Sequence, residues 1–145
     1  MTDNVIIITG PTASGKSDIA IKIAKAFDGE VISADSQQVY RYMDIGTNKT
    51  KEFDGINHHM LDIINPDQNF SVEDFSTRAK ELIRSISSKG RVPIIAGGTG
   101  FYVDSLLFEM NYGQVSKNQS LRDNLQAISD EKGNEYLYNL SLIHI

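Results

Sequence analysis

The sequence predicts an α/β fold in which helices flank a parallel sheet. Short apolar runs alternate along the chain with longer stretches whose apolar residues recur at helical spacing, a pattern typical of strand–helix–strand units. Two of the apolar runs lead directly into Gly-rich turns, as expected where the strands of such a sheet end at a ligand crevice. The three main candidate strands are residues 5–8, 31–34 and 91–96.

The first Gly-rich turn carries the strongest short motif. Residues 10–17 match G-x-x-x-x-G-K-[ST] between a strand and a helix, which is the context that this pattern requires and which disfavours a turn that binds nothing. Gly10 and Gly15 allow a tight turn whose backbone N–H groups point inward at an anion. The Lys16 ammonium adds a full positive charge, and Ser17 is placed to ligate a magnesium ion held by phosphates. We therefore expect a di- or triphosphate, with Mg²⁺, at Gly10, Pro11, Thr12, Ala13, Ser14, Gly15, Lys16 and Ser17.

The composition limits the class of protein. With 145 residues and 40% hydrophobic content, the chain can bury the core of one domain. A net charge of −5 disfavours indiscriminate binding to nucleic acids or membrane surfaces, so a polyanion must be met by a local basic patch. The absence of cysteine excludes disulfides and thiolate zinc sites, and the first apolar run is too short for a signal peptide or a membrane span. We therefore expect a soluble cytoplasmic protein.

The next elements in order are a helix and a strand that ends at an acid. A helix is expected over residues 15–27, ending at Asp28-Gly29. The strand at 31–34 is closed by Asp35, and because ligands collect outside the carboxyl ends of parallel strands, Asp35 belongs beside residues 10–17. Residues 41–57 are polar, show no sustained period and predict a long surface excursion. The apolar stripe of the helix comprises Ile19, Ala20, Ile23, Ala24 and Phe27.

Residues 58–64 predict a short strand, broken at Asn65-Pro66. The adjacent His58 and His59 suggest a metal site. However, neighbours on a strand point to opposite faces, and no cysteine or third nearby histidine completes such a site. We favour a hydrogen-bonded structural pair.

The second half of the chain begins with a capping box at residues 71–74, which starts a helix that ends at Lys89-Gly90. The strand at 91–96 then leads into the second Gly-rich turn, with a helix over 101–108 behind it. Beyond Met110 a linker precedes two polar helices, the first of them stopped at Gly133. We place a domain boundary near residue 112. The apolar stripes of the helices are Val72, Phe75, Ala79, Leu82, Ile83 and Ile86, then Leu121, Leu125 and Ile128, then Tyr136, Leu137 and Leu140.

Several longer stretches together resemble the tRNA dimethylallyltransferase family, also called tRNA isopentenyltransferases. They span most of the first 110 residues in the family's order. DSQQVYRYMDIGT followed by GGTG is far more specific than the motif at 10–17, which many families share. The matching stretches are GPTASGKS (10–17), ADSQQVYRYMDIGTNK (34–49), HHMLDI (58–63), F-S-x-x-D-F (70–75) and PIIAGGTGFYV (93–103).

The resemblance implies a P-loop NTPase-like fold whose phosphate loop holds the diphosphate of dimethylallyl diphosphate rather than ATP. The prenyl group would pass to the exocyclic amine of an adenosine beside the tRNA anticodon. Residues 1–112 would form an incomplete P-loop core, and residues 113–145 would begin a helical insertion that contacts tRNA. The implied partners are dimethylallyl diphosphate and the tRNA anticodon stem-loop, and we expect a monomer that binds no membrane.

The same resemblance implies roles for individual residues. Asp35 would be the general base on the amine, Thr99 would lie at the reacting centre, and Lys16 would neutralise the leaving diphosphate. Residue chemistry alone makes Asp35 an equally good magnesium ligand of the Walker-B type, and the DSQQVY context favours the base. The tRNA-contacting residues implied are Asp35, Ser36, Gln37, Gln38, Thr99 and Arg122.

Three residues also have structural explanations. Thr99 follows Gly97-Gly98 and could simply cap the next helix, a role compatible with facing the crevice. For Tyr40 and Tyr102 we favour core packing over stacking on a base.

Two rival functions remain. A P-loop small-molecule kinase using ATP would normally carry arginines that clamp the transferred phosphoryl group, whereas the chain has only five arginines and none cluster. A non-catalytic fragment is the other rival, because members of the family are about twice as long and their later portion supplies further strands and arginines.

Overall fold

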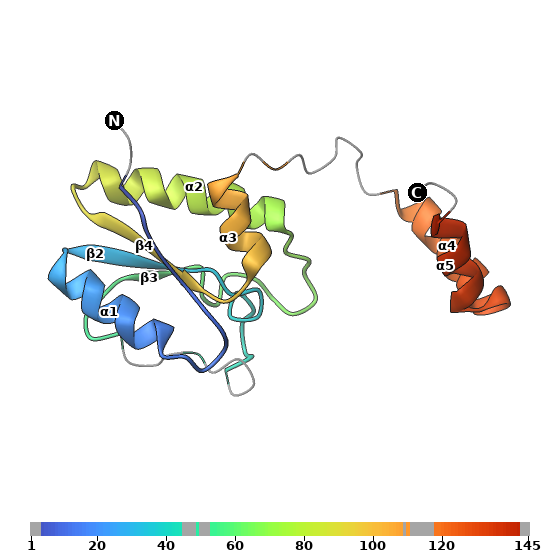
Figure 1. The fold of residues 1–145 in the computed structure, drawn as a ribbon, viewed down its shortest axis with the longest axis horizontal. Helices are drawn as coiled ribbons and strands as arrows, with labels where there is room; N and C mark the ends of the chain where they lie inside the picture. The colour runs from blue at the N-terminus through green and yellow to red at the C-terminus, as the bar shows by residue number, and fades with distance from the viewer. Residues whose placement is uncertain (1–3, 45–48, 50–52, 109, 111–117, 143–145) are drawn as a thin grey trace. The chain divides into compact units, whose positions relative to one another are not determined.

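The computed structural model describes residues 4–44, 49, 53–108, 110 and 118–142. The chain divides into two compact units, Met1–Met110 and Asn111–Ile145. The first unit contains a parallel sheet with helices, and the second contains a pair of helices (Figure 1).

The sheet of the first unit has four parallel strands in the order β1-β4-β2-β3. Thr9 lies opposite Gly97, and Ser33 lies opposite Ala96, so three strands end at the same edge. This arrangement confirms the predicted α/β class and brings both Gly-rich turns to one end of the sheet. The strands are β1 (Ile6–Thr9), β2 (Gly29–Ser33), β3 (His58–His59) and β4 (Val92–Gly97).

One face of the sheet is covered by α1 (Lys16–Ala26), which is one residue shorter at each end than the predicted range (Figure 1). Its buried side chains are Ala20, Ile21 and Ala24, and the two alanines pack against β2 and β4. The predicted stripe was wrong at its margins, because Ile19 is 47% and Phe27 59% exposed. Small alanines let the helix lie close to the sheet, so only a narrow stripe of it is buried.

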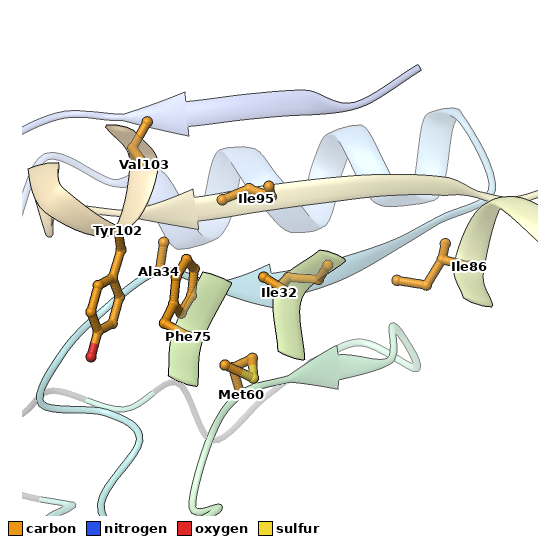
Figure 2. Close-up of a cluster of buried hydrophobic side chains, with 9 residues drawn as sticks. Ile32, Ala34, Met60, Phe75, Ile86, Ile95, Tyr102 and Val103 are labelled. Atoms are coloured by element: carbon orange, nitrogen blue, oxygen red, sulfur yellow. The ribbon is translucent and has the colours of Figure 1, made fainter. Parts of the chain in front are cut away.

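The other face is covered by α2 (Val72–Ser88) and α3 (Gly100–Leu107). The predicted capping box is confirmed: Asp74 N donates to Ser71 Oγ at 3.2 Å, and Ser71 N donates to Asp74 Oδ2 at 2.8 Å. Tyr102 of α3 is buried and stacks on Phe75 of α2, with ring centroids 4.1 Å apart (Figure 2). The core cluster of this face comprises Ile32, Ala34, Met60, Phe75, Ala79, Ile86, Ile95, Tyr102 and Val103.

The short strand β3 places two histidine rings in different surroundings. His59 Nε2 lies 2.7 Å from Glu30 Oε2, and the His58 ring packs 4.3 Å from Phe53 with its Nδ1 3.1 Å from the Ile56 carbonyl. Burial lowers the pKa of His58. Both rings are hydrogen-bonded, which confirms their structural interpretation. Within the described ranges, no group of three or more His, Asp or Glu residues could hold a metal ion.

The second unit consists of α4 (Gln119–Lys132) and α5 (Asn134–Leu142). The Asn118 side chain caps α4 by accepting from Leu121 N at 2.9 Å, and Gly133 ends it with a φ of 83°. Both helices lie where the sequence predicted them. The predicted linker at 111–114 and residues 45–48 and 50–52 of the predicted excursion lie outside the described residues. None of the helices in the described ranges has the length and hydropathy needed to cross a membrane.

Candidate active site at the carboxyl ends of the strands

A cavity of about 370 Å³ lies where β1, β2 and β4 end. It is lined by residues 12–18 from the first Gly-rich turn and by residues 96–98 from the second. Asp35, Gln38 and Lys49 complete the lining. The two Gly-rich turns therefore flank one crevice, as the sequence predicted, and Asp35 is part of its wall.

The first turn has the backbone of an anion-binding loop. Gly15 has a φ of 80° and Ala13 a φ of 62°, so the chain passes twice through the left-handed region before α1 begins. The Lys16 ammonium folds back over the loop, donating to the Pro11 carbonyl at 2.5 Å and to Ser14 Oγ at 3.4 Å. Phosphate oxygens would compete for these donors, because the loop oxygens are neutral acceptors.

The second turn needs glycine for close approach. A Cβ on Gly97 would lie 2.1 Å from the Ala34 carbonyl oxygen, which is closer than atoms can pack. A Cβ on Gly98 would lie 3.3 Å from the Gly10 carbonyl oxygen and 3.9 Å from Lys16 Nζ. The paired glycines thus let the end of β4 touch both the phosphate loop and the end of β2.

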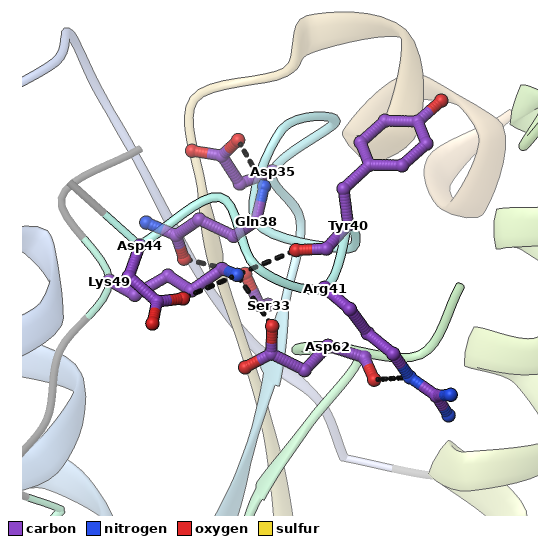
Figure 3. Close-up of polar contacts among 8 residues, drawn as sticks. All are labelled: Ser33, Asp35, Gln38, Tyr40, Arg41, Asp44, Lys49 and Asp62. Carbon is purple, nitrogen blue, oxygen red and sulfur yellow. Dashed lines mark hydrogen bonds and ion pairs between the residues drawn. The ribbon is translucent and has the colours of Figure 1, made fainter. Parts of the chain in front are cut away.

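Asp35 lies two residues beyond β2 and is half-buried. Its Oδ1 accepts the backbone N–H of Gln37 at 2.8 Å. The same oxygen accepts the backbone N–H of Gln38 at 3.3 Å (Figure 3). Such a turn fixes the orientation of an aspartate side chain. Oδ2 accepts neither of these two bonds. Oδ1 therefore fixes the orientation of the carboxylate, and Oδ2 is not needed for that purpose.

Two separate hydrogen-bonded pairs flank Asp35, one between Ser36 and Thr99 and one between Ser33 and Gln38. Thr99 Oγ1 accepts from Ser36 N at 3.0 Å and lies 3.4 Å from Ser36 Oγ, and Ser33 Oγ donates to Gln38 Oε1 at 3.3 Å. Thr99 occupies the N-cap position of α3, but its side chain makes no capping bond. Its hydroxyl therefore joins the turn after β2 rather than the helix behind it.

The remaining candidate residues lie outside the cavity wall. Tyr102 belongs to the core, as predicted, and burial raises its pKa to about 12. Tyr40 is only half-buried, and its backbone pairs with Ile64. Arg122 is exposed on α4 and is described within the second unit alone.

Lys49 was missed by the sequence analysis, although it ends one of the matching stretches. Its side chain is only 5% exposed, and its ammonium donates to the Tyr40 carbonyl and to the carboxylates of Asp44 and Asp62. Burial lowers the pKa of Lys49, but the hydrogen bonds to the two carboxylates raise it above its usual value overall. A lone lysine inside a polar segment gave no periodic signal from which burial could be inferred.

Comparison with known protein families matches residues 38–142 to the family described as IPP transferase. A tRNA dimethylallyltransferase of Alkaliphilus oremlandii is 51% identical over 141 residues, which cover 96% of this chain and 45% of that protein. Another, of Acetivibrio thermocellus, is 50% identical over 139 residues, covering 94% of this chain and 44% of that protein. The chain thus spans a little under half the length of these curated relatives.

Solved structures have the same fold. The full-length tRNA isopentenylpyrophosphate transferase of Bacillus halodurans aligns with a TM-score of 0.76 at 42% identity, covering 98% of this chain and 48% of that one. A eukaryotic dimethylallyltransferase acting on tRNA aligns with a TM-score of 0.74 at 34% identity, covering 86% of this chain and 32% of that one. These likenesses confirm the expected P-loop NTPase-like fold.

Proposed function

Because the chain belongs to the IPP transferase family, we propose that the complete protein transfers a dimethylallyl group from dimethylallyl diphosphate to tRNA. The acceptor atom is the exocyclic amine of an adenosine beside the anticodon. The allylic C–O bond breaks, a C–N bond forms, the amine loses a proton, and diphosphate leaves. The observation that carries this proposal is that Lys16 and Asp35 line one cavity.

The phosphate loop supplies the donor site. Backbone N–H groups of residues 12–17 and the Lys16 ammonium would bind the diphosphate and neutralise the charge that grows on it as it leaves. Lys16 would exchange its present bonds to Pro11 and Ser14 for phosphate oxygens. The donor can therefore bind without rearrangement of the sheet.

The donor set of the cavity also suits Mg²⁺, which prefers oxygen ligands and keeps substrate phosphates in its shell. The side chains of Ser17, Asp18 and Asp35 on the cavity wall offer only oxygen. We assign Ser17 to the metal, together with phosphate oxygens. There Mg²⁺ would supply further neutralisation of the leaving diphosphate.

Asp35 supplies the acceptor chemistry. An aromatic amine is a poor nucleophile until it loses a proton, and a carboxylate within hydrogen-bond reach can accept that proton as the C–N bond forms. Such general-base catalysis contributes about a hundred- to ten-thousandfold in rate. Ser36, Gln37, Gln38 and Thr99 would contact the adenosine around it.

The second unit is assigned to tRNA through the exposed Arg122 on α4. The proposal places the protein in the cytoplasm as a monomer. Binding of a tRNA substrate is supported by the relatives named for that activity, not by the overall charge of −5.

A competition experiment on this chain tests the donor assignment. Dimethylallyl diphosphate should displace a bound nucleotide, and no ATP-dependent phosphorylation of nucleosides or metabolites should occur. Clear phosphorylation without affinity for dimethylallyl diphosphate would instead establish a P-loop kinase. If the protein of the complete reading frame transfers the dimethylallyl group and this chain does not, residues 1–145 are the donor-binding part of that protein.

A further inference from the structure

Lys49 is a buried cation in the cavity wall, and all three N–H donors of its ammonium have acceptors. Its ammonium lies 2.6 Å from the Tyr40 carbonyl oxygen, 3.1 Å from Asp44 Oδ1 and 2.5 Å from Asp62 Oδ1 (Figure 3). Lysine is almost never buried unless it is paired, and an ammonium has three donors. Three acceptors use these donors, so Lys49 is arranged to hold protein segments together rather than to bind a substrate anion.

The contacts join the segment that follows Asp35 to the segment that follows β3. Tyr40 and Asp44 belong to the first segment, and Asp62 belongs to the second. Arg41 adds a bond from its Nε to the Asp62 carbonyl at 2.9 Å. Backbone bonds also pair the two segments, from Asp62 N to Gln38 O at 3.1 Å, from Ile63 N to Val39 O at 2.9 Å and from Arg41 N to Ile64 O at 2.8 Å.

The joined segments contain costly backbone conformations. Tyr42, Met60 and Asp62 have φ values of 64°, 65° and 53°, in the left-handed region that side chains other than glycine rarely adopt. Such conformations persist only where the surrounding structure over-determines them, and they gather at functional sites. The bonds of Lys49 to Tyr40 and Asp44 lie on both sides of Tyr42, and its third bond holds Asp62 itself, so Lys49 supplies part of that restraint.

The restraint reaches Asp35 through Gln38. The Gln38 carbonyl accepts from the second segment, while the Gln38 N–H donates to Asp35 Oδ1 at 3.3 Å. Loosening the second segment would therefore loosen the turn that orients the carboxylate. Within the described residues, the hydrogen bonds of Lys49 do not reach the phosphate loop.

We propose that Lys49 is a positioning residue for prenyl transfer: it holds residues 36–44 against residues 60–64 and thereby orients Asp35 toward the acceptor amine. The inference rests on the proposed function, because it assigns Lys49 to the acceptor side of that reaction. It predicts a defect in turnover without a defect in donor binding.

The kinetic test uses the protein of the complete reading frame. Lys49→Met should lower kcat about a hundredfold, the loss expected from a small misplacement of a reacting group, while the dissociation constant for dimethylallyl diphosphate changes less than twofold. Lys49→Arg, which keeps the charge, should recover kcat to within about tenfold of wild type. The matched control is Lys25→Met, which removes an exposed ion pair with Asp54 at 2.8 Å and should leave kcat unchanged.

Two kinetic results would overturn the proposal. One is a wild-type kcat in Lys49→Met. The other is a parallel loss of donor binding and turnover, which would indicate a general structural defect. Should Lys49→Met fail to fold, Asp62→Asn removes the negative charge of one half-exposed acceptor and should cause a smaller loss of kcat in the same direction.

Hydrogen exchange on this chain tests the restraint independently of activity. Lys49→Met should speed exchange of the amides of Arg41, Asp62 and Ile63 by at least about tenfold, because these amides bridge the two segments. Amides of α1 should exchange at the wild-type rate. Exchange of the bridging amides at the wild-type rate in Lys49→Met would show that Lys49 does not restrain the two segments, whatever the activity of the enzyme. Absence of transfer activity in the wild-type protein of the complete reading frame would overturn the proposed function alone.

Discussion

Lys16 is the residue on which the proposed donor site depends most directly. Its ammonium lies in the cavity wall, where it donates to two neutral oxygens of its own loop, so the charge is beside the proposed donor site before any substrate arrives. Pre-oriented charges of this kind need little rearrangement when they meet a phosphate. Binding of the donor should therefore be sensitive to this one side chain.

Replacing Lys16 with methionine should weaken binding of dimethylallyl diphosphate by about ten- to a hundredfold, because a hydrogen bond to a charged group contributes about 1.5–3 kcal/mol. Titration calorimetry on this chain measures the change. Lys22→Met is the matched control, since Lys22 is exposed on the same helix and outside the cavity lining. Equal losses in the two variants would show that net charge, not the loop, binds the donor.

Gly97 provides a second test that depends on a single residue. Gly97→Ala should destabilise the chain by about 1–3 kcal/mol, because the new Cβ would overlap the backbone of Ala34 and the end of β4 would have to move. Urea unfolding measures this free energy. Gly100→Ala is the control, since no atom lies within 4 Å of its Cβ position, and it should be neutral or slightly stabilising. A Gly97→Ala variant as stable as wild type would refute the close approach.

Among the elements, the strands are tied together at the end opposite the site by one buried carboxylate. Glu30 of β2 is 1% exposed and accepts from His59 of β3 and from Arg91, which precedes β4. Lys89 Nζ lies 3.7 Å away. Burial raises the pKa of Glu30, but the hydrogen bonds from His59, Arg91 and Asn57 outweigh it and lower the pKa to about 2.

This lowered pKa predicts how stability depends on pH. The unfolded carboxyl titrates near 4.5, so the stabilisation from Glu30 is fully present above that pH and is lost as the pH falls toward 2. The contribution is on the order of 3 kcal/mol. Urea unfolding of wild type and Glu30→Gln should show a stability difference that is largest at neutral pH and shrinks below pH 4.5. A difference independent of pH would show that Glu30 is not held as a carboxylate.

The elements themselves were largely predictable from the sequence. The strands around β1, β2 and β4 and the helices α1, α2 and α3 were each predicted because periodicity and capping signals report local preference. The exposure of Ile19 and Phe27 was not predictable, because spacing shows which residues are apolar but not how wide a stripe the sheet covers.

The candidate site was predictable only where it follows from topology. Asp35 and the two Gly-rich turns were placed together because parallel strands end at one edge. The bond between Ser36 and Thr99 joins residues 63 positions apart, and Lys49 is buried only because the fold brings Asp62 to it. Such contacts depend on tertiary packing and leave no periodic trace in the sequence.

At the scale of the whole molecule, the described part of the second unit does not provide a basic surface. Arg122 and Lys132 are its only basic residues within 118–142, against Asp123, Asp130, Glu131 and Glu135. Affinity for nucleic acid comes mainly from neutralised phosphates. We therefore expect this chain to bind dimethylallyl diphosphate but to hold tRNA weakly, which separate titrations with the donor and with an anticodon stem-loop would measure.

Prenyl transfer to unmodified tRNA by the protein of the complete reading frame, with and without the substitution Asp35→Asn, tests directly whether Asp35 accepts the proton of the amine. We expect transfer by the wild type and a loss of at least about a hundredfold in the variant, with unchanged affinity for dimethylallyl diphosphate, because only the acceptor of the proton is removed. Transfer by Asp35→Asn at the wild-type rate would show that the proton leaves by another route and that Asp35 is not the base.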